Sequence, residues 1–156
     1  KPCVNDADCF NNLDSSSIVL LQENCILTPP PLEFARLLGC GINHVLRDPV
    51  GIAKTFAQKH RCTLLLKSAT TVIASPNGKI RYNISGNPGL AKGGSGDVLT
   101  GIITALLAQK LTAFDAACVG AFLLGSSADK ALELLENRAL IAEDVIDAVA
   151  LCIGNN

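Results

Sequence analysis

A glycine-rich stretch from Gly86 to Gly96 is the part of this sequence best suited to chemistry. It holds five glycines in eleven residues and leads through Asp97 into an apolar, helix-forming run. Such backbone lets several N–H groups converge on one anion, and the N-terminus of the following helix adds partial positive charge. A carboxylate at Asp97 then lies beside the bound phosphate. This placement suits a base that deprotonates a hydroxyl about to receive a phosphoryl group.

Neither of the two most familiar phosphate signatures describes this loop. The sequence contains no G-x-x-x-x-G-K-[ST] and no strand-coupled G-x-G-x-x-G. The loop therefore indicates a phosphate site outside the P-loop and Rossmann classes. The alternative is a tight turn that only packs against a sheet, with Asp97 as an ordinary aspartate in the first turn of a helix.

The elements that must position this loop are strands before it and helices after it. Short apolar runs and turn signals predict strands at Pro2–Asn5, Cys25–Leu27, Cys62–Lys67, Thr71–Ser75 and Lys79–Ile84, with a further apolar run at Ile18–Leu21. The last two strands form a hairpin around Asn77-Gly78. Helical patterns cover Leu32–Leu38, Pro49 to about His60 with Asp48 as N-cap, Gly96–Gln109, Ala113–Gly125, Ser127–Glu136 and Ala142–Cys152.

Composition narrows the class of protein. The chain has 156 residues, of which 49% are apolar and only 4% aromatic, so we expect an aliphatic core between helices and a buried parallel sheet. A net charge of −1 argues against a nucleic-acid partner. No apolar run approaches the roughly 20 residues that span a bilayer, and no signal peptide is visible. We expect a cytoplasmic protein.

The cysteines and histidines do not suggest a disulfide framework or a metal site. There are seven cysteines, an odd number, without a C-x-x-C pair, and five of them lie in apolar runs. We expect buried free thiols in a reducing compartment. His44 and His60 lack partners at metal-ligand spacing, so no structural zinc is expected.

Four segments resemble a known family. The string from Gly86 to Gly101, GNPGLAKGGSGDVLTG, is similar to the signature of the NAD(P)H-hydrate dehydratases, a branch of the ribokinase-like superfamily. LTPPPLEF at Leu27–Phe34 resembles the family's T-P-H-P-G-E segment, and LKSATT at Leu66–Thr71 resembles L-K-G-x-x-T. The run from Asp6 to Leu13 matches D-A-D-x-[LF]-x-x-L. These motifs occur in the family's order over nearly the whole chain.

The resemblance implies a fold and a domain. The expected fold is α/β, a ribokinase-like three-layer arrangement with a mostly parallel sheet, a β-hairpin and a helical C-terminal half. Residues 1–156 are expected to form a single domain. The chain has no methionine and opens inside a strand, whereas the family carries a region before the D-A-D element. We therefore expect that the N-terminal part of the domain is missing.

The resemblance also implies a reaction and its participants. Asp97 would deprotonate the C6 hydroxyl of hydrated NADH or NADPH while ADP or ATP transfers a phosphoryl group to it; phosphate then leaves. The glycine loop would stabilise the transferring phosphoryl group, and the L-K-S-A-T-T segment would lie along the nucleotide's ribose and α-phosphate. The expected nucleotide-binding residues are Lys67, Ser68, Ala69, Thr70, Thr71, Gly93, Gly94, Ser95 and Gly96.

On the substrate side, Pro30, Asn87 and Asp97 are expected to bind the hydrated dinucleotide, with Asn87 alternatively orienting the loop. Glu33 is the candidate carboxylate for Mg²⁺ through water, or else a first-turn glutamate. Asp6 and Asp8 lie at a strand end, where Asp8 is a candidate to approach the metal or the phosphates and Asp6 is equally a candidate to cap the next turn. The chain departs from the family in three places that bear on binding: Pro30 replaces histidine, Leu32 replaces glycine and Ser68 replaces glycine.

Two other readings remain open. A ribokinase-like kinase for a vitamin-precursor alcohol would share the loop and Asp97 but keep its phosphorylated product, and a non-catalytic nucleotide-binding module would explain the departures. The family leads us to expect a homo-oligomer, fused to or paired with an epimerase domain. The choice between ADP and ATP does not follow from the sequence.

Overall fold

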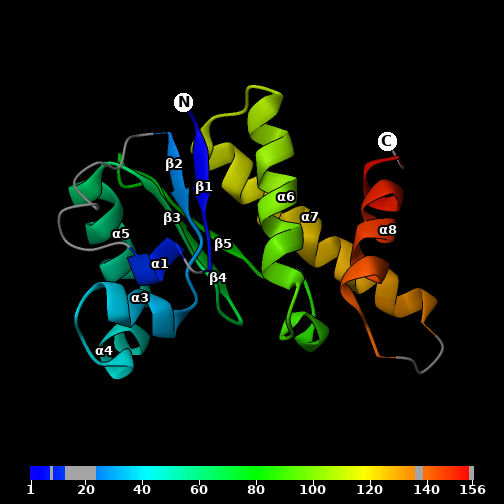
Figure 1. Ribbon diagram of the computed structural model, residues 1–156, viewed down its shortest axis with the longest axis horizontal. Coiled ribbons are helices and arrows are strands. Elements are labelled where there is room, and N and C mark those ends of the chain that lie inside the picture. Colours follow the sequence, from blue (N-terminus) through cyan, green and yellow to red (C-terminus); the bar gives the residue numbers. More distant parts are fainter. Residues whose placement is uncertain (8, 13–23, 136–138, 155–156) are drawn as a thin grey trace.

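Five strands form one mixed sheet in the order β1-β2-β3-β4-β5 (Figure 1). The computed structural model describes residues 1–7, 9–12, 24–135 and 139–154. β1, β2 and β3 are parallel, and β4 and β5 continue the sheet antiparallel. The strands are β1 (Cys3–Asn5), β2 (Cys25–Leu27), β3 (Thr63–Leu66), β4 (Thr71–Ala74) and β5 (Ile80–Asn83). Three of the five strands are thus parallel, and the other two form the expected hairpin.

The hairpin between β4 and β5 confirms the turn expected at Asn77-Gly78. Gly78 has a φ of +84°, in the left-handed region where a side chain is strained. The Ser75 and Lys79 backbone groups close the turn, with Ser75 N–H donating to Lys79 C=O at 3.0 Å. The Ser75 hydroxyl also accepts from the Lys79 N–H at 2.9 Å.

Both faces of the sheet are covered by helices, as Figure 1 shows. On one side lie α3 (Pro31–Leu37), α4 (Ile42–Arg47) and α5 (Pro49–His60); on the other lie α6 (Ser95–Ala108) and α7 (Ala113–Leu134). β3 is buried throughout because its side chains alternate between the two layers. Leu64 and Leu66 pack into the α5 side, and Leu65 packs into the α6–α7 side.

The α5 layer is less aliphatic than composition suggested. Phe34 and Phe56 meet edge to face with ring centroids 5.1 Å apart, and both are buried. Asp48 caps α5 as expected, since its carboxylate accepts from the Gly51 N–H at 2.8 Å. His60 is the last residue of α5, and its ring packs against that of Phe56 with the two ring centroids 4.5 Å apart.

The prediction of two helices at Ala113–Gly125 and Ser127–Glu136 was wrong. A single helix, α7, runs from Ala113 to Leu134. Gly125 resembles a helix break in the sequence but serves packing instead: an added Cβ would lie 2.1 Å from Ser85 Oγ. α8 (Ala142–Ile153) follows as expected and packs on α7, outside the sheet layers (Figure 1).

Two further expectations need correction. β1 was expected to be buried, but its residues are exposed or half-buried because β1 is the edge strand of the described sheet. All seven cysteines are free thiols, yet only Cys25 and Cys62 are buried, and Cys3 is exposed. Burial raises the pKa of the Cys62 thiol to about 12. The run at Ile18–Leu21, Asp8 and Leu13 lie outside the described residues.

No helix in the described part of the chain combines the length and apolar character needed to cross a bilayer.

Candidate active site

A cavity of about 700 Å³ lies where the parallel strands end. The chain leaves β2 toward Pro30 and β3 toward Lys67, and the N–H of Lys67 donates to the Pro29 C=O at 2.9 Å. Ligands of open α/β sheets bind at this carboxyl edge. The cavity is closed by the start of β4, the end of β5, the glycine-rich loop and the start of α6. Its apolar lining includes Leu65, Leu99, Ala121 and Leu124.

The structure brings together eight of the residues expected at the site. They line this one cavity although they come from segments far apart in the chain: Pro30, Lys67, Ser68, Ala69, Thr71, Asn87, Ser95 and Gly96. In the turn after β3, the Ser68 hydroxyl donates to the Thr70 C=O at 2.5 Å, and the Thr71 hydroxyl donates to the Ser68 C=O at 3.3 Å.

The other five expected residues do not line the cavity. Thr70, Gly93 and Gly94 lie in the turns that carry lining residues, and Glu33 lies in the first turn of α3. Asp97 is the third residue of α6, directly after Gly96, and its side chain is exposed. The expected base is therefore beside the cavity and open to a ligand that extends out of it.

The start of the glycine loop is fastened by Asp129 on α7. One carboxylate oxygen accepts from the Gly86 N–H at 2.8 Å and the other from the Asn87 side-chain amide at 3.0 Å. The Asn87 side-chain oxygen in turn accepts from the Gly89 N–H at 3.0 Å and caps the short 3-10 helix η1 (Pro88–Leu90). Asn87 thus orients the loop and also lines the cavity. No local sequence pattern pointed to Asp129, because its partners lie 42 and 43 residues earlier.

Glycine is required at two positions at the end of the loop, at one because of its backbone conformation and at the other because of close packing. Gly94 precedes α6 with a φ of +88°, a left-handed conformation that favours glycine. A Cβ on Gly96 would lie 2.9 Å from Asp6 Oδ2 and 3.4 Å from Lys67 Nζ. The backbone of the α6 N-terminus therefore rests directly on an ion pair.

That ion pair joins the ends of β1 and β3. Lys67 Nζ donates to Asp6 Oδ1 at 2.6 Å, and the Thr100 hydroxyl on α6 donates to Asp6 Oδ2 at 3.3 Å. Burial by itself raises the pKa of Asp6, but the hydrogen bond and positive charge of Lys67 outweigh it, so the pKa lies below its usual value. Asp6 therefore holds the Lys67 ammonium under Gly96, a role that the D-A-D motif alone did not reveal.

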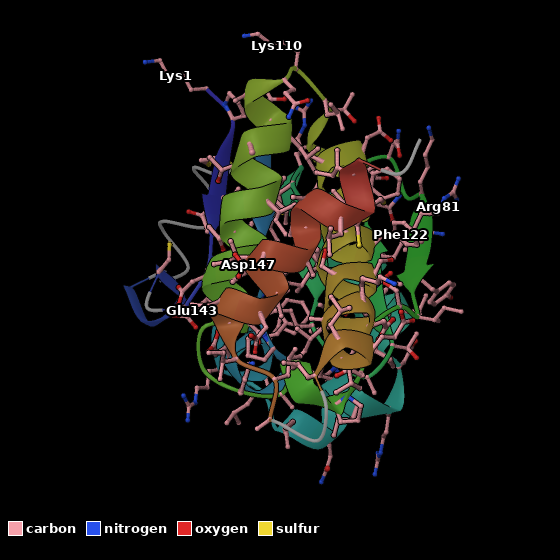
Figure 2. The ribbon with its side chains drawn as sticks, turned by 90° about the vertical axis from the view of Figure 1, so that its right-hand side faces the viewer. Lys1, Arg81, Lys110, Phe122, Glu143 and Asp147 are labelled. Carbon is pink, nitrogen blue, oxygen red and sulfur yellow. The ribbon has the colours of Figure 1, made fainter. Side chains whose placement is uncertain are left out.

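The outer side of the loop packs on the segment that leads into α8. A Cβ on Gly94 would meet Ala142 Cβ at 3.2 Å, and one on Gly89 would meet Leu140 at 3.0 Å. The Lys92 ammonium donates to the Leu140 C=O. In Figure 2, α8 with Glu143 and Asp147 lies in front of α6 and α7, so this helix covers the loop's flank from outside the sheet layers.

The described residues offer no ready-made metal site. No three His, Cys, Asp or Glu side chains among them are grouped as metal ligands. The carboxylate of Asp6 already faces Lys67 and Thr100. Mg²⁺ commonly keeps several waters and takes only one or two carboxylates beside phosphate oxygens. A magnesium ion held in that way needs no cluster of protein ligands.

Comparison with known proteins agrees with this geometry. The model of the NAD(P)H-hydrate dehydratase family matches residues 1–150. The bifunctional NAD(P)H-hydrate repair enzyme Nnr of Moorella thermoacetica is 43% identical over 99% of this chain, which covers 29% of that protein. A crystal structure of the ADP/ATP-dependent NAD(P)H-hydrate dehydratase from Bacillus subtilis, grown with ATP and Mg²⁺, is 33% identical with a TM-score of 0.78.

The Bacillus match covers 83% of this chain and 48% of the crystallised one. A ribokinase-like superfamily protein from Enterococcus faecalis is 25% identical, with a TM-score of 0.78 over 99% of this chain and 52% of its own. The chain therefore spans about half of these solved structures and less than a third of the Moorella protein. The expected ribokinase-like fold is confirmed.

Proposed function

Because this chain belongs to the NAD(P)H-hydrate dehydratase family, we propose that it forms the phosphoryl-transfer site of a nucleotide-dependent NAD(P)H-hydrate dehydratase, a lyase of nicotinamide-nucleotide repair. The observation that carries the proposal is the cavity at the strand ends, which the glycine loop, the start of α6 and Lys67 close together. Anion-binding backbone, a helix N-terminus and a cation there suit a nucleotide's phosphates.

The reaction begins with phosphorylation of the substrate. Asp97 takes the proton from the C6 hydroxyl of the hydrated nicotinamide ring while that oxygen forms a bond to the terminal phosphorus of ADP or ATP. The bond from this phosphorus to the bridging oxygen of the nucleotide breaks. The exposed position of Asp97 beside Gly96 leaves room for a second ligand to approach from outside the cavity.

Elimination then restores the reduced nicotinamide. Phosphate leaves C6 with the electrons of the C–O bond, and a proton leaves the neighbouring ring carbon, so the ring double bond forms again. Hydroxide is a poor leaving group and phosphate is a good one, which explains why a dehydratase uses a kinase-type site. The backbone of Gly93–Gly96 offsets the charge on the transferring phosphoryl group.

The remaining assignments are carried over from the family resemblance and are part of the proposal. Lys67, Ser68, Ala69, Thr70 and Thr71 hold the nucleotide, and Pro30 and Asn87 contact the hydrated dinucleotide. Mg²⁺ supplies charge neutralisation on the donor phosphates when it is bound, with Glu33 as the carboxylate that holds it through water. Self-association and pairing with an epimerase domain belong to the same proposal.

The test is recovery of the reduced-nicotinamide absorbance from hydrated NADH or NADPH. It uses the complete polypeptide in which this chain occurs, with Mg²⁺ and either ADP or ATP. We expect recovery in step with release of inorganic phosphate, and the more active nucleotide identifies the donor. A phosphorylated product that accumulates would indicate a small-molecule kinase instead. Nucleotide binding without any turnover would indicate a non-catalytic module.

A further inference from the structure

We propose that Lys92 is a second phosphate contact, which grips the terminal phosphates of the nucleotide and favours the donor with more of them. The inference rests on the proposed function, because it concerns the same cavity. Nothing in the reaction scheme above uses Lys92.

The charges that line the cavity are the first step. Among the lining residues that the structure describes, two carry a formal charge, Lys67 and Lys92, and both are cations. Asp6 is the acidic residue that faces one of them, from beneath Gly96. The remainder of the lining is apolar or neutral polar. Such a cavity attracts a polyanion.

The second step is that the two lysines are not equivalent. Lys67 lies 2.6 Å from a carboxylate whose charge compensates its own, and Gly96 covers the pair. The Lys92 ammonium has the Leu140 C=O as its hydrogen-bond acceptor, a neutral group. A charge-assisted bond to a phosphate oxygen is stronger than a bond to a carbonyl. A phosphate that enters the cavity can therefore draw the Lys92 side chain away from Leu140.

The third step is the position of Lys92 in the loop. It directly precedes the Gly93–Gly96 segment, so its ammonium and those backbone N–H groups can reach the same anion. Asp129 fastens the loop at Gly86 and Asn87, and the packing of Gly94 on Ala142 fixes the other side. The backbone is thus held while the flexible side chain is free to change rotamer. Under the proposed function the Gly93–Gly96 backbone binds the transferring phosphoryl group, which is the terminal one of the donor, so an ammonium that reaches the same anion contacts the terminal phosphates.

The experiment compares the affinities of AMP, ADP and ATP for the wild type and for Lys92→Met. Methionine keeps an unbranched apolar stem and removes the charge. Binding is measured by calorimetry with Mg²⁺ at a fixed salt concentration, using the complete polypeptide. We expect about a tenfold loss of ATP affinity, the size of one charged hydrogen bond, a smaller loss for ADP and none for AMP. Lys110→Met, beyond the opposite end of α6, is the matched control and should leave all three unchanged.

Equal losses for AMP and ATP would overturn the inference, because a residue that merely props the loop against Leu140 affects every nucleotide alike. An unchanged ATP affinity in Lys92→Met would overturn the inference as well. In both cases, nucleotide binding by the wild type would leave the proposed function intact. Failure of the wild type to bind any nucleotide would overturn both.

A second measurement needs no variant. The wild type is treated with an amine-acetylating reagent, and modification of each lysine is followed by mass spectrometry. ATP is expected to protect Lys92 and AMP is not, with Lys110 unaffected by either. Equal modification of Lys92 with ATP and with AMP contradicts the proposal even if Lys92→Met does not fold.

Discussion

Two aspartates near the α6 N-terminus have opposite surroundings. Asp6 is largely enclosed, with Lys67 on one oxygen and Thr100 on the other. Asp97 is exposed, one residue after the cavity-lining Gly96. A carboxylate already bonded on both oxygens is suited to hold other groups in place, whereas an exposed one can accept a proton from an arriving ligand. Under the proposed function, Asp6 therefore positions Lys67 and Asp97 acts as the base.

Replacing Asp97 by asparagine tests its proposed role as the base. The asparagine side chain has nearly the same shape but cannot take a proton, so we expect turnover of hydrated NADH to fall by at least about 10²-fold. Nucleotide affinity should be retained, because Asp97 does not line the cavity. Asp147→Asn, an exposed aspartate on α8, is the control (Figure 2). Turnover of Asp97→Asn close to that of the control would exclude Asp97 as the base.

The positioning role of Asp6 is tested by comparing how the unfolding free energies of the wild type and of Asp6→Asn depend on pH. The folded pKa of Asp6 lies below its unfolded value, so the pair stabilises the protein above the unfolded pKa of about 3.9. That contribution is lost as the pH falls through the folded pKa. We expect the variant to lose about 1 kcal/mol of unfolding free energy at neutral pH, measured by urea denaturation.

The difference between wild type and Asp6→Asn should shrink as the pH falls below about 4, because protonated Asp6 no longer attracts Lys67. A difference that stays constant from about pH 7 down to about pH 3 would show that the contribution of Asp6 is steric.

At the scale of elements, the site depends on how closely α7 approaches the chain after β5. Asn83 donates through its side chain to the Ala121 C=O at 3.2 Å, and the Ser85 hydroxyl donates to the Phe122 C=O at 3.2 Å. Gly125, one turn further along α7, permits contact with Ser85. The next residues are Gly86 and Asn87, which Asp129 holds from the same helix. α7 thus fixes the start of the glycine loop.

Gly125→Ala tests this close approach. The new Cβ would lie 2.1 Å from Ser85 Oγ and 2.5 Å from the Ser85 carbonyl carbon, so the loop must shift. We expect a loss of about 1–3 kcal/mol in unfolding free energy, as for other overpacked sites, together with weaker nucleotide binding. Denaturant titration and calorimetry measure the two effects.

Gly101→Ala on α6 is the matched control, because nothing lies within 4 Å of its added Cβ. It should be neutral or stabilise the protein by up to about 1 kcal/mol through helix propensity. If Gly125→Ala behaved in the same way, the close approach of α7 would not be needed for the fold.

At the scale of the whole molecule, local signals predicted most of the elements, but they missed α4 and did not predict the contacts between elements. Asn77-Gly78 fixed the hairpin, and Asp48-Pro49 fixed the start of α5, since each acts within a few residues. Gly125 led to the wrong prediction of a helix end, because in the sequence a glycine that permits close packing within a helix looks like one that ends a helix. Asp6 meets Lys67 across 61 residues only because parallel strands end at one edge, a contact that no local pattern contains.

The cavity is assembled from strand ends, a hairpin, a loop and two helices, so it exists only while these elements stay packed together. A nucleotide that binds there binds the folded state alone. With ATP and Mg²⁺ at about 100 times the Kd, we expect about 2.7 kcal/mol of added stability. For a domain of about 150–250 residues that raises the Tm by about 5–10 °C, and by less in a longer cooperative unit. Calorimetry on the complete polypeptide measures the rise.

Asp129→Asn should diminish the rise in Tm that ATP causes, although Asp129 does not line the cavity. An asparagine amide presents an N–H group to one of the two donors, Gly86 N–H or the Asn87 amide, so one anchor of the loop is lost. About tenfold weaker binding removes about 1.4 kcal/mol of the stabilisation by ATP. Asp147→Asn should keep the full rise. A full rise in Asp129→Asn as well would mean that the loop holds its phosphate-binding shape without α7, and that the long-range anchoring inferred above does not control the site.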